Sequence, residues 1–210
     1  MQRALDQNIA LAPPRQRLPQ LLDGRPEILH CYCGNHGVPW HLDAVLVERG
    51  FRVLSRDWEI PPFISLIDPE EHAQLRGDLR AGRFTGLLID LPCETRSRAR
   101  NNPGGPPPLA SFDFPYGRPD MPVEFFPEWE ASEPQRAAAL ELISGARFGG
   151  AWSVWENPGF LGDSPSIYIL PEVDAVMDET GSQRVSFVQG VWARPVRSPQ
   201  RSRAPCRICM

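Results

Sequence analysis

A cysteine near the middle of the chain has the surroundings of a nucleophile. The apolar run at residues 87–89 predicts a short buried strand, and Pro92 forces a turn because proline cannot continue a strand ladder. Cys93 follows at the carboxyl end of that strand, where ligands collect in open α/β sheets. Cationic neighbours favour the thiolate form of a cysteine, and three arginines come next at alternate positions: Arg96, Arg98 and Arg100. The alternative interpretation is a half-buried structural cysteine in a turn.

A carboxylate ends a second candidate strand. The strand predicted at residues 151–156 finishes at Glu156, and Asn157 and Pro158 follow it directly. In a parallel sheet the carboxyl ends of strands meet at one edge, so Glu156 and Cys93 are expected to face the same cavity. A carboxyl group there can donate a proton or a hydrogen bond to a substrate. The alternative is an ordinary turn, because Asn-Pro commonly starts one.

A glycine-bearing turn and an acid surround the first predicted helix. Gly34 and Gly37 follow the strand predicted at residues 28–33, and Asp57 follows the next strand. In a β–α–β unit a tight turn lets a ligand approach the backbone, and the acid accepts hydrogen bonds from ribose hydroxyls. Glu59 is the alternative acid. The other interpretation is an ordinary strand–helix turn with a surface aspartate.

The elements that must position these residues alternate between strand and helix patterns. Strands are predicted at residues 28–33, 51–56, 84–90, 151–156 and 184–189. Helices are predicted at about residues 39–49, 68–75, 132–144 and 170–177. This alternation predicts an α/β fold with one mostly parallel sheet, helices on both faces and right-handed crossovers.

The composition predicts one domain with long loops. The chain has 210 residues, of which 24 are proline and 17 are glycine, and a chain of this length can bury a full core. Residues 1–26 are predicted to be an arm outside the domain, which spans residues 27–190. Residues 101–134 are rich in proline but also in aromatic side chains, which predicts an extended loop packed over the domain. The arginine-rich residues 191–210 are predicted to form a basic, disordered tail.

Charge and cysteine usage restrict the class of protein. A net charge of −4 argues against a generally basic nucleic-acid binder but leaves room for a local cationic patch. No apolar run has the length of a membrane span, and the N-terminus lacks the hydrophobic core of a signal peptide. Five cysteines, an odd number, indicate reduced thiols. We expect an intracellular protein of the nucleus or cytoplasm, neither secreted nor in a membrane, and assume a monomer.

One cysteine pair raises the question of zinc. The chain contains a Cys-x-x-Cys pair at Cys206 and Cys209, which is half of a zinc site, and Cys31 and Cys33 could supply the other half. These two lie in a predicted core strand far away in the sequence. The sequence therefore predicts no metal site.

The order of these motifs resembles the catalytic domain of cytosine-5 DNA methyltransferases. It is most similar to the small methyltransferase-like proteins of that superfamily found in retroelement-associated families, and the resemblance covers about residues 27–190. The matching stretches are Tyr32-Cys33-Gly34-Asn35-His36-Gly37, Asp57, Gly77-Asp78-Leu79, Pro92-Cys93 and Glu156-Asn157-Pro158. Ser97-Arg98-Ala99-Arg100 and Gly105-Pro106-Pro107-Pro108-Leu109 resemble the smaller subgroup.

The resemblance implies a Rossmann-like fold, a cofactor and a mechanism. A cytosine flipped out of DNA would be attacked at carbon 6 by Cys93, while Glu156 donates a hydrogen bond or proton to ring nitrogen 3 and Asn157 helps to hold the base. Carbon 5 would then take the methyl group of S-adenosylmethionine. The implied cofactor-binding residues are Gly34, Gly37, Asp57, Asp78 and Pro92. The implied nucleic-acid contacts are Arg96, Arg98 and Arg100.

The chain also departs from the family pattern. His36 replaces a glycine of the cofactor turn, Leu91 replaces the glycine before Pro-Cys, and no segment is long enough for a target-recognition domain. These departures favour the alternative of a catalytically inactive module of a retroelement-derived protein, binding nucleic acid or no substrate. A third interpretation is a methyltransferase acting on RNA or a small molecule, because the fold alone does not determine the substrate.

Overall fold

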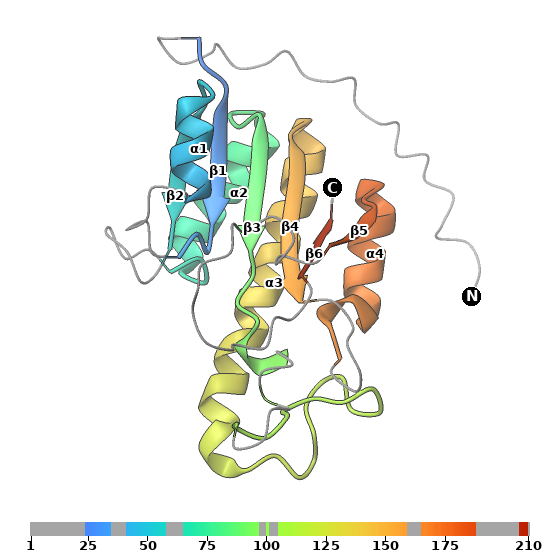
Figure 1. Cartoon of the computed structure of the whole chain (residues 1–210). Helices are drawn as coiled ribbons and strands as arrows, with labels where there is room; N and C mark the ends of the chain where they lie inside the picture. The colour runs from blue at the N-terminus through green and yellow to red at the C-terminus, as the bar shows by residue number, and fades with distance from the viewer. Residues whose placement is uncertain are drawn as a thin grey trace, which may run out of the picture.

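A six-stranded sheet organises the molecule. The computed structural model describes residues 24–34, 41–57, 65–96, 100, 105–158, 165–187 and 206–209. The strands lie in the order β2-β1-β3-β4-β6-β5 (Figure 1). Their bounds are Glu27–Cys31 for β1, Arg52–Arg56 for β2, Gly86–Asp90 for β3, Trp152–Pro158 for β4, Arg184–Phe187 for β5 and Cys206–Cys209 for β6.

The sheet is parallel apart from one strand. β1 pairs in parallel with β2 and β3, and β3 pairs in parallel with β4. β6 runs antiparallel to both of its neighbours, β4 and β5, so β5 has the same direction as β1 to β4. The predicted α/β class, with all five predicted strands in one mostly parallel sheet, is confirmed.

Helices cover both faces of the sheet. They are α1 (Leu42–Glu48), α2 (Pro69–Arg80), α3 (Phe126–Gly149) and α4 (Pro171–Thr180). α3 packs against α2 and against α4, so these three form one layer (Figure 1). Leu29 and Cys31 of β1 belong to the core under this layer, whereas His30 bonds Asp43 of α1. Because successive side chains of a strand point to opposite faces, α1 lies on the other face, as predicted.

The proline-rich segment builds a lobe below the sheet rather than a plain loop. Its described part, residues 105–125, ends in the short 3₁₀ helix η3 (Val123–Phe125) and continues into α3, which begins six residues before the predicted start at residue 132. Leu109, Ala110, Met121 and Trp129 form a small second core there. The lobe is therefore tied to the domain by the first turns of the long helix α3.

Two further predicted boundaries are wrong. The helix predicted to end at about residue 75 continues to Arg80, because Gly77 is tolerated within α2. Residues 206–209, predicted to lie in a disordered tail, form β6 and fill the place between β4 and β5. Without β6, the described parts of these two strands would have no hydrogen-bonding partner between them. Within the described residues, none of the helices has the length and apolar character that a bilayer span requires.

Two helical glycines predict opposite responses to alanine. A Cβ at Gly149 would lie 1.8 Å from the carbonyl oxygen of Leu79, whereas a Cβ at Gly77 would meet nothing within 4 Å. We expect Gly149→Ala to lower the free energy of unfolding by about 1–3 kcal/mol, because α3 must move away from α2. Gly77→Ala should raise it by up to about 1 kcal/mol through helix propensity. Urea unfolding of both variants checks this, and effects of the same sign would contradict the close contact.

Candidate functional site

The carboxyl ends of β1, β3 and β4 bring the sequence-predicted residues to one edge of the sheet. Asp90, the last residue of β3, lies opposite Glu156 of β4 in the parallel register. Cys93 follows β3 after a turn and precedes the short 3₁₀ helix η1 (Glu94–Arg96). Cys93 and Glu156 thus come from neighbouring strands, as predicted, although β4 continues two residues beyond Glu156 to Pro158. That the two side chains face one cavity stays a prediction.

Asn157 connects the two strand ends directly. Its side chain is buried, and Nδ2 donates a hydrogen bond of 3.4 Å to the carbonyl oxygen of Leu91. Its other side-chain atom, Oδ1, is buried without a hydrogen-bond partner among the described residues. Pro92 lies in the same turn, between Leu91 and Cys93. The edge therefore offers an acceptor, Asn157 Oδ1, next to the turn that carries the cysteine.

The Cys93 thiol is neutral in this arrangement. Burial, together with the nearby charges of Glu94 and Glu156, raises the pKa of Cys93 to about 12. The expectation that the following arginines would stabilise its thiolate is wrong for Arg96 and Arg100, because neither is among the described groups that act on its pKa; Arg98 lies outside the described residues. The effect of Glu156 on Cys93 also shows that the two side chains lie within electrostatic reach of each other.

Arg96 is a buried structural residue. Its guanidinium is stacked 4.8 Å from the centroid of the Trp129 ring, donates to the carbonyl oxygen of Pro115 and pairs with Glu133 at 3.2 Å. Only 3% of its side chain is exposed. The guanidinium binds the lobe and α3 to the Cys93 turn and is not available to nucleic acid.

Arg100 is used in the same way. It donates to the carbonyl oxygen of Glu94 at 2.6 Å and to that of Pro107 at 3.3 Å, and it forms an ion pair with Glu128. The predicted nucleic-acid contacts at Arg96 and Arg100 are therefore corrected to contacts inside the protein. The third predicted contact, Arg98, lies outside the described residues.

The glycine turn and the strand-end acid lie together, as predicted. Gly34 has a φ of +65°, a backbone conformation that favours glycine, and its N–H donates to Asp57 Oδ2 at 2.8 Å. Among the described residues, a Cβ at Gly34 would meet nothing within 4 Å. Tyr32, two residues before Gly34, has a φ of 56°, strain of a kind that clusters at functional sites. Gly37 lies outside the described residues.

Asp78 lies at the opposite edge of the sheet. It is in the last turns of α2, where it pairs with Arg83 at 2.6 Å. Arg83 also reaches Glu27, the first residue of β1, at 3.4 Å. The prediction that Asp78 lines one pocket with Gly34 and Asp57 is wrong, since α2 continues through the stretch that matched a cofactor motif.

A buried histidine between two carboxylates was missed in the sequence. His30 of β1 is fully buried; its Nδ1 bonds Asp43 of α1, and its Nε2 lies 3.1 Å from Asp90 Oδ2. Burial lowers the pKa of His30, but the hydrogen bonds and charges of the two carboxylates outweigh it and raise the pKa to about 9. The sequence signal for this buried site was the single histidine within the apolar run of β1.

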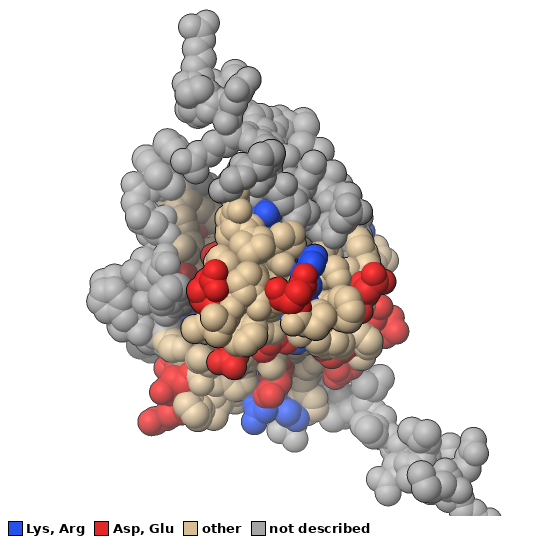
Figure 2. Space-filling view, turned by 90° about the horizontal axis from the view of Figure 1, so that it is seen from below, with Lys and Arg blue, Asp and Glu red and all other residues tan. Residues whose placement is uncertain are grey.

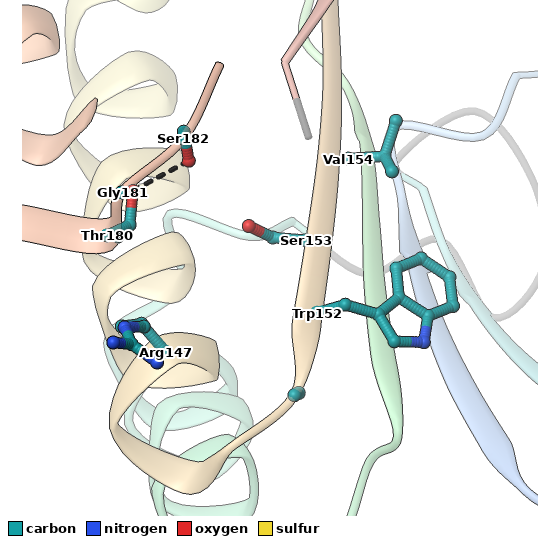
Figure 3. Close-up of a pocket in the computed structure, with 8 residues that line it drawn as sticks. Arg147, Trp152, Ser153, Val154, Thr180, Gly181 and Ser182 are labelled. Carbon is teal, nitrogen blue, oxygen red and sulfur yellow. Dashed lines mark hydrogen bonds between the residues drawn. The ribbon is translucent and has the colours of Figure 1, made fainter. Parts of the chain in front are cut away.

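Two cavities lie away from this edge. One of about 340 Å³ is formed by the ends of α3 and α4 at the amino end of β4. Arg147 and Ser153 point towards it, whereas Trp152 and Val154 lie on the other side of β4 (Figure 3). A groove of about 630 Å³ runs over α2, α3 and α4. Neither contains Cys93, Glu156 or Gly34.

The chain matches no protein-family model, no curated protein and no solved structure.

The neutral state of Cys93 predicts its reactivity towards iodoacetamide. With a pKa of about 12, its thiolate fraction should rise about tenfold per pH unit between about pH 8 and pH 10, whereas an ordinary cysteine levels off above its pKa of about 8.5. Mass spectrometry of the Cys93 peptide gives the rate, with the urea-unfolded chain as control. A plateau already reached near neutral pH would show a thiolate and contradict this electrostatic description.

Proposed function

We propose that the chain is an S-adenosylmethionine-dependent methyltransferase of the DNA cytosine-5 type. One observation carries the proposal: β3 and β4 are adjacent parallel strands, and Asn157 of β4 bonds Leu91 in the turn that carries Cys93, so this turn and the end of β4 lie at a single edge of the sheet. The glycine turn closed by Asp57 lies at that same edge, one strand away. The candidate nucleophile Cys93, the carboxylate Glu156 and the glycine turn would thus come together at one edge, in the order that the family resemblance implies.

The mostly parallel sheet with helices on both faces agrees with the fold that the resemblance implies. Here β6 is antiparallel and lies between β4 and β5. α1 follows β1 and α2 follows β2, and these two helices lie on opposite faces of the sheet.

The residues at this edge fit the proposed cofactor. Open space at Gly34 allows a ligand to approach the backbone, and Asp57 is a carboxylate of the kind that accepts hydrogen bonds from ribose hydroxyls. Pro92 would border the same space from the turn after β3. When bound, S-adenosylmethionine would supply an electrophilic methyl group.

The chemistry assigned to the chain's own residues follows from their charges. Cys93 must lose its proton to solvent and add its sulfur to carbon 6 of cytosine, which makes carbon 5 nucleophilic; the proton taken up by ring nitrogen 3 returns to Glu156 when the sulfur leaves. Glu156 must carry a proton to donate to ring nitrogen 3, and a protonated Glu156 no longer raises the pKa of Cys93. Asn157 would act as a positioning residue, since its side chain is buried and its Nδ2 donates to the carbonyl oxygen of Leu91 in the turn that carries Cys93. After methyl transfer, loss of the proton on carbon 5 and departure of the sulfur restore the aromatic ring.

A second candidate is a catalytically inactive module of a retroelement-derived protein. The neutral Cys93 and the position of Asp78 away from the edge favour it. So does the lobe, whose end shows acidic and uncharged side chains with few basic ones (Figure 2). Residues 105–131 carry one arginine and five acids, namely Asp113, Asp120, Glu124, Glu128 and Glu130. Such a surface repels phosphate, so DNA would have to approach elsewhere.

Cofactor binding tests the proposal. Isothermal titration of the purified chain with S-adenosylmethionine should give one weak site, and Asp57→Ala should weaken it about tenfold or more, the value of one lost hydrogen bond to a charged group. Asp78→Ala is the matched control at the opposite edge and should bind like wild type. No heat from wild type at millimolar cofactor, or equal loss in both variants, would remove the claim.

A further inference from the structure

Three side chains with different donor atoms converge below the glycine turn. His30 comes from β1, Cys33 from the turn after it and Asp43 from the first turn of α1. Their donor atoms, a ring nitrogen, a thiol sulfur and a carboxylate oxygen, all lie within 4.8 Å of one another, and all three residues are buried. We propose that His30, Cys33 and Asp43 bind a divalent transition-metal ion, with Zn²⁺ as the expected occupant.

The spacing of the donor atoms suits a tetrahedral ion. Zinc bonds of about 2.0 Å to nitrogen or oxygen and about 2.3 Å to sulfur place the ligand atoms about 3.3–3.6 Å apart. The three atoms would have to shift by an ångström or so, and the hydrogen bond between His30 and Asp43 would open. His41 is not a fourth ligand, because its Nδ1 accepts from the backbone N–H of Asp43 at 3.3 Å and its Nε2 donates to the carbonyl oxygen of Cys33 at 2.7 Å.

Outer groups already orient two of the three ligands. Asp90 Oδ2 lies 3.1 Å from His30 Nε2, which leaves Nδ1 directed at the cluster. Ser55 Oγ donates to Asp43 Oδ2 at 2.5 Å, which leaves Oδ1 as the ligand atom. A metal-bound histidine commonly donates its other ring N–H to a carboxylate, and a metal-bound carboxylate is itself hydrogen-bonded. These contacts are a second observation, independent of the distances among the three ligands.

The donor set selects the kind of ion. A thiolate and an imidazole suit Zn²⁺ and its softer neighbours, whereas Mg²⁺ and Ca²⁺ are bound by oxygen atoms. On binding, Cys33 would lose its thiol proton and His30 its Nδ1 proton to solvent, and the sulfur and the freed nitrogen would bond to the metal, while His30 Nε2–H stays directed at Asp90. The ion would fix the turn that carries Gly34 to the start of α1, whether or not the chain transfers methyl groups. The site therefore stands independently of the proposed function.

Cobalt titration tests the site directly. The full chain is freed of metal with a chelator and titrated with Co²⁺, whose thiolate complexes show a sulfur-to-cobalt charge-transfer band. We expect one ion per chain, with Zn²⁺ displacing it. Cys33→Ser should abolish the charge-transfer band. It should also weaken Co²⁺ binding by at least about tenfold, which is the loss expected when even a group that only hydrogen-bonds a metal ligand is removed. Two controls should keep the charge-transfer band and the Co²⁺ affinity of wild type: Cys93→Ser, and the double variant Cys206→Ser with Cys209→Ser.

Protection of the wild-type cysteine keeps the test valid if Cys33→Ser does not fold. In mild urea, Zn²⁺ should slow alkylation of Cys33 by iodoacetamide, while Cys93 in the same sample reacts at an unchanged rate. Absence of stoichiometric binding at a severalfold molar excess would overturn the proposal, as would a band that persists in Cys33→Ser or disappears with Cys206 and Cys209. In that case the cluster is a hydrogen-bonded ion triad of His30 with Asp43 and Asp90.

Discussion

Replacing Arg96 by alanine should lower the free energy of unfolding by about 3–5 kcal/mol, the cost of removing one partner of a buried ion pair. The Arg96 side chain is almost fully buried, and its guanidinium is stacked on the Trp129 ring. Its loss would leave the carbonyl oxygen of Pro115 and the Glu133 carboxylate without these hydrogen bonds. The stem of an arginine also packs against apolar surface, so part of the loss is packing rather than charge.

The matched control is an arginine within the lobe that Arg96 contacts. Arg118 pairs with Asp120, but both side chains are exposed, so Arg118→Ala should leave the unfolding midpoint essentially unchanged. Urea denaturation followed by tryptophan fluorescence reports the lobe, because Trp129 belongs to its core. If Arg96→Ala left stability unchanged but weakened binding of a DNA duplex, Arg96 would be a nucleic-acid contact and the structural role assigned to it would be wrong.

The role of Arg96 explains why the lobe matters to the candidate site. Arg96 is the last residue of the 3₁₀ helix that begins next to Cys93, and Arg100 donates a hydrogen bond to the carbonyl oxygen of Glu94 in the same helix. The acids that hold these two guanidinium groups come from α3, at Glu133 and Glu128. The position of the cysteine therefore depends on the packing of the lobe, and unfolding of the lobe should release the Cys93 turn.

Strand positions were predictable because burial dictates an apolar run. Residues 87–89 and the first strand around His30 are apolar on the face that meets α2 to α4, and each run ends at a turn residue. Gly34 and Asp57 were predictable as a pair because a tight turn needs a glycine and neighbouring parallel strands end at one edge. The same reasoning placed Cys93 near Glu156 without any knowledge of their contacts.

Side-chain partners were not predictable, because they depend on residues far away in the chain. Arg96 pairs with Glu133, which is 37 positions away in the sequence, and His30 bonds Asp90, which is 60 positions away. The Gly77-Asp78-Leu79 stretch matched a cofactor motif by type, yet Leu79 is a core residue and the helix continues through it. β6 was missed because the arginines around it suggested a solvated tail, although three of the four residues in Cys-Arg-Ile-Cys are apolar.

Trapping of a covalent adduct tests the central claim most directly. DNA with 5-fluorocytosine blocks loss of the group on carbon 5, so an active enzyme stays attached through Cys93 in the presence of S-adenosylmethionine. We predict a denaturation-resistant adduct whose peptide contains Cys93, its complete loss in Cys93→Ser, and slower formation in Glu156→Gln. Asp78→Ala should form the adduct at the wild-type rate. No adduct from wild-type chain that still binds the cofactor would contradict methyl transfer by Cys93 and establish the inactive module instead.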